Sequence, residues 1–160
     1  MTDSIQERLT AAATTGGAHA QNVPTESNIG TLYASPAPFA SISMTVCDAF
    51  KLWVDQVNAV GGVEVQAFHK KIPIKLIAYD DQSSTATAAT LYNQLITQDH
   101  VNLLIADSGS VLTSVGVPIA KEHKQFLFDV SGTGAAFFTN DNPYIALMSD
   151  PVSTIWPHYI

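Results

Sequence analysis

Basic residues, cysteines and long apolar runs are all scarce in this chain of 160 residues. Lysine and arginine total 7 against 14 acidic residues, and Arg8 is the only arginine. No basic cluster is therefore available to neutralise the phosphates of a nucleic acid. Cys47 is the only cysteine, which excludes an internal disulfide, a small disulfide scaffold and a cysteine-based metal site. No apolar run is long enough for a transmembrane helix.

Apolar residues, by contrast, are abundant. They make up 46% of the chain while charged residues make up 13%, which excludes a charge-rich disordered protein. The length is sufficient for one domain with its own core and too short for two ordinary domains. So many apolar residues with so few charges indicate a surface that is covered by another subunit or by more of the same chain.

Residues 1–27 differ from the rest, because they are small, polar and without periodicity. They are interpreted as a flexible N-terminal arm or the remnant of a signal peptide. Ala18-His19-Ala20 has the form of a signal-peptidase site, but the stretch before it is weakly hydrophobic. Asp3 and Glu7 also stand where an export signal would carry basic residues, so the unstructured arm is favoured.

From residue 28 onward, strand and helix patterns alternate. The apolar spacing predicts helices at 46–60, 85–98 and 111–123, a short helix at 135–138, and strands at 28–33, 72–80, 101–106, 126–130 and 143–148. Residues 63–71 are predicted as a loop. This order implies right-handed crossovers between parallel strands. The expected fold class is α/β, with an open, mostly parallel Rossmann-like sheet flanked by helices.

Several polar or aromatic side chains receive structural rather than functional interpretations. Trp53 lies on a helical apolar stripe and is predicted to be core, and Cys47 is expected to be buried or inert. Asp80 and Asp81 end a strand, and a solvated turn or helix start is favoured over a ligand, hinge or metal role. The histidines are scattered, so no metal site is expected; they are His19, His69, His100, His123 and His158.

Ligands of an open parallel sheet bind beyond the carboxyl ends of its strands, where three loops are rich in hydroxyls and glycine. These loops are 33–36, 107–110 (continuing to Thr113) and 131–134. Ser110 and Thr113 are three residues apart at a predicted helix N-terminus, where free N–H groups favour an anion. Such a pair can hold a carboxylate, although the spacing alone favours a simple N-cap role for Ser110.

Motifs for nucleotide binding and nucleophilic catalysis are missing. There is no G-x-x-x-x-G-K-[ST] sequence, and Gly132-Thr133-Gly134 lacks the third glycine of a dinucleotide fingerprint. There is also no G-x-S-x-G nucleophile elbow. We therefore expect no catalytic residues, no cofactor and no enzymatic activity.

Four motifs occur in a recognisable order: N-A-V-G-G-V at the end of the first helix, Y-D-D at the end of a strand, S-V-L-T at 110–113, and the small-residue turn at 131–134. In this order they resemble the N-terminal lobe of type I periplasmic substrate-binding proteins. Within that class the chain is similar to the leucine/isoleucine/valine-binding branch of ABC importers. The resemblance covers residues 28–160, which are interpreted as a partial N-terminal lobe.

The resemblance implies a set of ligand-binding residues from the three loops. They are Tyr33, Ser35, Ser108, Gly109, Ser110, Thr113, Ser131, Gly132 and Thr133. One departure is Ala106-Asp107, which stands where the family often has Gly-Pro, and Asp107 could favour an amide or amine head group.

The implied function is that of an extracytoplasmic, periplasmic protein that binds a branched-chain amino acid or a similar small carboxylate or amide for ABC-type import. Its partner in the full-length family is an ABC transporter permease. A ligand-sensing regulatory domain of the amide-sensor type and a truncated remnant without a ligand are the alternatives. Because family members are much longer, we expect weak binding by one lobe and a homo-oligomer formed through its exposed apolar surface.

Overall fold

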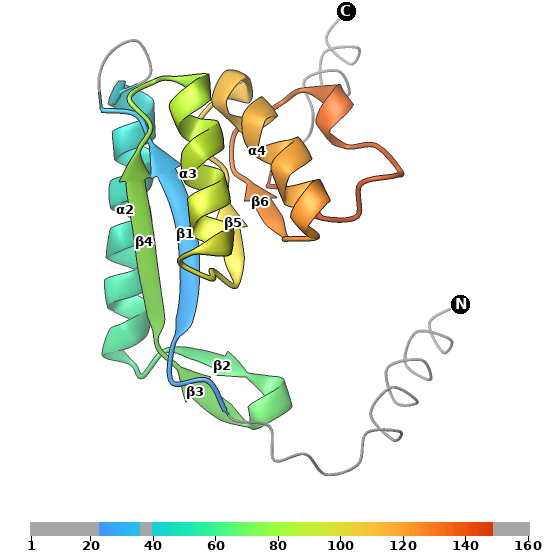
Figure 1. Ribbon diagram of the computed structural model, residues 1–160. Coiled ribbons are helices and arrows are strands. Elements are labelled where there is room, and N and C mark those ends of the chain that lie inside the picture. The colour runs from blue at the N-terminus through green and yellow to red at the C-terminus, as the bar shows by residue number, and fades with distance from the viewer. Residues whose placement is uncertain (1–22, 36–39, 149–160) are drawn as a thin grey trace, which may run out of the picture.

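The computed structural model describes residues 23–35 and 40–148. Five strands form one sheet in the order β4-β1-β5-β6-β7, and all four pairings are parallel (Figure 1). Their bounds are β1 (Ser27–Tyr33), β4 (Ile74–Asp80), β5 (Leu103–Ile105), β6 (Leu127–Asp129) and β7 (Ile145–Leu147). The predicted α/β class with an open parallel sheet is confirmed.

Helices cover the two faces of the sheet unequally, as Figure 1 shows: α2 (Ala40–Ala59) lies on one face, and α3 (Thr85–Thr97) and α4 (Ser110–His123) lie on the other. The 3₁₀ turn η2 (Ala135–Phe137) replaces the short helix expected there. Helix α2 begins six residues before its predicted start. Its first turns carry the buried polar residue Ser43 in place of an apolar one, which hides the helical stripe.

The predicted loop at 63–71 is wrong. These residues include a small antiparallel hairpin of β2 (Val63–Val65) and β3 (Lys70–Ile72), joined through the 3₁₀ turn η1 (Gln66–Phe68). Each strand has only three residues, too few for an alternating pattern to stand out. A glycine is required at 62, where φ is +101° and a Cβ atom would lie 2.2 Å from the carbonyl oxygen of Ile72.

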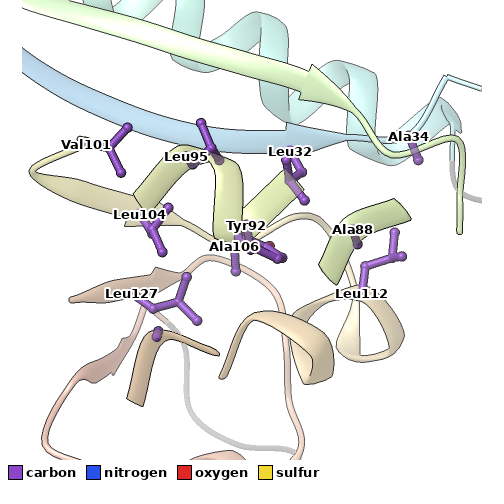
Figure 2. Packing of buried hydrophobic residues seen from close by; sticks show 11 residues of the cluster. Leu32, Ala34, Ala88, Tyr92, Leu95, Val101, Leu104, Ala106, Leu112 and Leu127 are labelled. Atoms are coloured by element: carbon purple, nitrogen blue, oxygen red, sulfur yellow. The ribbon is translucent and has the colours of Figure 1, made fainter. Parts of the chain in front are cut away.

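The main core lies between the sheet and the α3–α4 layer. Figure 2 shows side chains of β1, β5 and β6 meeting those of the two helices, with Leu104 and Leu127 near Tyr92. A second cluster, beneath α2, joins Ile29, Val54, Ile74 and Ile105. Strand β5 therefore packs on both faces, which explains its continuous apolar sequence.

Helix α2 leaves part of its face of the sheet open. An apolar groove of about 600 Å³ lies beside it, lined by Ile29, Val46, Ala49, Phe50, Trp53, Leu103, Ile105, Phe128, Val130 and Met148. Trp53 lies in this groove and is 42% exposed, so the prediction that it is core is wrong. The apolar stripe of α2 that contains Trp53 is present, but the described residues cover only one side of this stripe.

Candidate functional site

Two of the three predicted loops are joined directly by hydrogen bonds at the carboxyl edge of the sheet. The amide of Gly109, after β5, donates to Ser131 Oγ at 2.8 Å, and the amide of Thr133, after β6, donates to Ser110 Oγ at 3.1 Å. Parallel strands end at a common edge, which brings together residues more than 20 positions apart. The two loops therefore form one continuous surface at the start of α4.

The N-terminus of α4 has no side-chain cap. Gly109, before the first helical residue, has φ 86° and ψ 155°, a conformation restricted almost entirely to glycine. No side chain caps the helix, and among the described residues the amides of Ser110, Val111 and Leu112 have no hydrogen-bond partner. Free N–H groups and the helix dipole make this position suitable for an anion.

Ser108 adds an unused hydroxyl next to these amides. Its side chain belongs to a residue that is only 5% exposed, and its Oγ has no partner in the described part of the chain. A buried hydroxyl without a hydrogen bond costs free energy, so such groups in proteins usually serve a bound molecule or water. The structure thus places Ser108 among the best candidates for ligand contact.

Thr113 occupies a different environment from Ser110. Its side chain is fully buried, and its hydroxyl donates to the carbonyl oxygen of Asp107 at 3.0 Å. Ser110 is only partly buried and accepts from the neighbouring loop. Spacing along the sequence could not separate these roles, because both residues belong to the same helical turn. In the described structure Thr113 anchors the loop and Ser110 lies at its surface.

A buried carboxylate holds the loop after β6. Asp129 Oδ1 accepts from the amides of Ser131 at 3.1 Å and Gly132 at 2.6 Å. Burial raises the pKa of Asp129 above its ordinary value, while these amide bonds act against that rise. Asp129 was not among the predicted site residues. An acidic residue inside the apolar run F-L-F-D-V is the signal that could have identified it.

The loop after β1 brings Ser35 to the carboxyl edge of the sheet. The ring of Tyr33, the last residue of β1, lies near Lys51 on α2 instead. Lys51 Nζ lies 5.9 Å from the centre of the Tyr33 ring. Ser35 is exposed, and both its amide and its hydroxyl donate to the carboxylate of Asp80. Burial alone would raise the pKa of Asp80, but the bonds from Ser35 and from the Gln82 amide lower it below its ordinary value.

Asp81 and Asp107 both lie in the interior beneath these loops. The favoured prediction was a solvated turn or a helix start; Asp81 is not solvated, since its side chain is fully buried, but it does hold the turn before α3 by accepting from the amides of Ser83 and Ser84. Asp107 is also buried, and its Oδ1 accepts from Ser43 Oγ at 2.5 Å and from the amide of Ser108 at 2.6 Å. Asp107 thus faces the protein interior, and one of its oxygens is already bonded to the protein.

Metal-binding and membrane-spanning features are not found in the described residues. They contain no group of three or more histidine, cysteine or acidic residues that could hold a metal ion. Within the same ranges, no helix combines the length and the apolar character needed to cross a bilayer. His69, His100 and His123 are exposed, whereas His19, His158 and the Ala18-His19-Ala20 motif lie outside the described residues. Cys47 is buried, as expected.

The fold and the edge together define a class of protein: an α/β lobe with an uncapped helix N-terminus and several hydroxyls at the carboxyl edge of its sheet. The family model described as periplasmic binding protein matches residues 26–153, and the chain belongs to this family.

Solved structures of longer proteins share the fold. A branched-chain amino acid transporter substrate-binding protein from Streptococcus pneumoniae, in complex with isoleucine, is 25% identical with a TM-score of 0.70, over 80% of this chain and 35% of that protein. A solute-binding protein of an ABC transporter from Rhodopseudomonas palustris, in complex with 3,4-dihydroxybenzoic acid, is 21% identical with a TM-score of 0.67, over 81% of this chain and 33% of that protein. A leucine-binding protein from Thermotoga maritima is 14% identical with a TM-score of 0.64, over 78% of this chain and 33% of that protein. The chain therefore spans about a third of the length of these neighbours.

Proposed function

We propose that this chain is the N-terminal lobe of an extracytoplasmic solute-binding protein and that it holds the carboxylate of a branched-chain amino acid or a similar small acid for ABC-type import. The observation that carries the proposal is the uncapped N-terminus of α4, with the free amides of Ser110, Val111 and Leu112 beside the unpartnered hydroxyl of Ser108. These three amides and one hydroxyl are four hydrogen-bond donors within five consecutive residues, and none of them belongs to a basic side chain. Such a set of neutral donors at a helix N-terminus suits a carboxylate.

The residues around these donors supply shape and orientation. Ser110 Oγ accepts from the Thr133 amide, and its own hydroxyl hydrogen can turn toward a ligand. Ser35, Ser131 and Gly132 extend the same polar edge. Nothing in this arrangement pairs a nucleophile with a general base, and we propose binding without catalysis.

The wider setting of the function follows the family. We propose a periplasmic location and an ABC transporter permease as the partner of the longer protein. The open apolar groove beside α2 supports our expectation that the isolated chain self-associates.

Calorimetric titration with L-leucine tests the carboxylate site. We expect weak binding, with a Kd on the order of 1 mM, because the described residues form only one wall around the ligand. L-leucinamide, which lacks the negative charge, is expected to bind at least about tenfold more weakly. Ser110→Ala should weaken leucine binding by about threefold to tenfold, since it removes one hydrogen bond.

Ser114→Ala is the matched control on the same helix. Its hydroxyl is exposed and donates only to the Val111 carbonyl, so leucine affinity should be unchanged. Equal affinity for leucine and leucinamide would contradict the carboxylate site. Preference for leucinamide would instead support an amide-sensing lobe.

A further inference from the structure

Two buried carboxyl groups, Asp81 and Asp107, lie at the carboxyl ends of the two strands that flank β1. Asp81 follows β4 and Asp107 follows β5, and both are tied to the end of β1, the strand between them: the Asp81 amide donates to the Tyr33 carbonyl oxygen, and Asp107 is linked to the Ala34 amide through Ser43 Oγ. Each carboxyl group influences the pKa of the other. Two ionised carboxylates can only accept hydrogen bonds, so a hydrogen bond between these two groups would require a proton on one of them. Neither Oδ2 atom has a donor among the described residues, whereas each Oδ1 has at least one.

We propose that Asp81 and Asp107 share one proton through their Oδ2 atoms at neutral pH, and that this acid pair positions the Ser108–Ser110 loop. The pair connects four parts of the chain. Asp81 Oδ1 accepts from the Ser83 amide at 2.9 Å, and Asp107 Oδ1 accepts from Ser43 on α2 and from the Ser108 amide. Ser43 Oγ in turn accepts from the Ala34 amide, after β1, at 2.8 Å.

The groups that face the pair make a second ionisation unfavourable. Asp80 acts on both carboxyls, the Cys47 thiol on α2 faces Asp107, and Tyr92 on α3 accepts from the Asp107 amide at 3.1 Å. Asp129, the last residue of β6, interacts with Tyr92. None of the three ion pairs among the described residues includes Asp81 or Asp107. The charged groups that act directly on Asp81 and Asp107 are all acidic.

The pair has a defined pH dependence. Burial, followed by the charge of Asp107, raises the pKa of Asp81 from 3.8 to about 7, and burial also raises the pKa of Asp107. The folded state then keeps a proton that the unfolded state releases. The free energy of unfolding should consequently fall as pH rises from about 4 through about 7. A single shared charge also leaves less negative potential beneath the anion site, a consequence that rests on the proposed function.

Urea unfolding of the 160-residue chain at pH 5.0 and pH 8.5 tests the pair without any ligand. The folding equilibrium constant of the wild type should fall at least about tenfold between the two pH values. In Asp107→Asn the amide nitrogen can donate permanently to Asp81, as the shared proton does, so the fall should shrink to about threefold or less. Asp141→Asn, at an exposed carboxylate, should keep the wild-type fall. Asp129→Asn removes a buried carboxyl group outside the pair, and this variant should retain most of the wild-type fall in the folding equilibrium constant.

Carbon-13 titration of the aspartate carboxyl groups in the Asp129→Asn variant supplies a measurement that does not require Asp107→Asn to fold. One aspartate resonance should titrate near pH 7, and its partner well below it. If all aspartate resonances titrate below about pH 5, or if Asp107→Asn shows the full wild-type fall, no proton is shared and the proposal is overturned. Both readouts concern the unliganded chain, so a failure of leucine binding would not affect them.

Discussion

Leu104→Ala is expected to destabilise the chain by about 3–5 kcal/mol, a large part of the roughly 5–15 kcal/mol that keeps an ordinary domain folded. Leu104 is fully buried on the central strand β5, in the cluster that joins the sheet to α3 and α4 (Figure 2). The cavity left by alanine would be enclosed by Leu95, Leu127 and other side chains that are themselves fully buried, so the site cannot easily collapse. Urea unfolding followed by circular dichroism measures this loss.

Leu52→Ala is the matched control, because it makes the same change on α2 at a side chain that is 59% exposed. It should change the free energy of unfolding by less than about 0.5 kcal/mol. Similar losses for the two variants would mean that β5 is not the centre of the folded core.

Gly132→Ala should destabilise the chain by about 2–4 kcal/mol and also weaken leucine binding. An added Cβ would lie 2.5 Å from Asp129 Oδ2 and 2.8 Å from Thr113 Cγ2. Neither neighbour can move freely, because Asp129 holds the loop amides and Thr113 is buried and bonded to Asp107. Relief of the clash must displace the loop after β6, and with it the bonds from this loop to Gly109 and Ser110. Thermal unfolding and calorimetric titration measure the two effects.

Ala136→Ser adds one heavy atom nearby, in η2, at an exposed position. It should leave both stability and affinity within about 0.5 kcal/mol of the wild type. Gly132→Ala protein with wild-type stability would show that the loop is not held by Asp129 as described.

The regular elements were predictable because their signals are local. The apolar spacing predicted strands at 28–33, 72–80 and 101–106 and helices at 85–98 and 111–123, and each of these ranges overlaps a strand or helix of the structure. The carboxyl-edge loops could be placed because parallel strands all end at one side of the sheet. The meeting of the loops that contain Ser110 and Ser131 follows from that topology.

The features that sequence reasoning missed depend on contacts between distant residues. The inward position of Asp81 brings it under the influence of Asp107, 26 positions further along the chain, and the exposure of Trp53 depends on what covers the α2 face of the sheet. Asp81 looks like an ordinary turn acid and Trp53 like an ordinary core residue when only their neighbours in sequence are considered. The hairpin of β2 and β3 was missed for a local reason, since three-residue strands carry too little pattern.

The most direct test of the carboxylate site is amide NMR of the ¹⁵N-labelled chain during titration with L-leucine. We predict that the largest shift changes occur at the amides of Ser110, Val111 and Leu112, followed by Ser108 and the loop at 131–133. L-leucinamide at the same concentrations should leave these amides nearly unchanged. If leucine moves none of them up to its solubility limit, or if its effects gather around Trp53 in the apolar groove, the α4 N-terminus is not the ligand site.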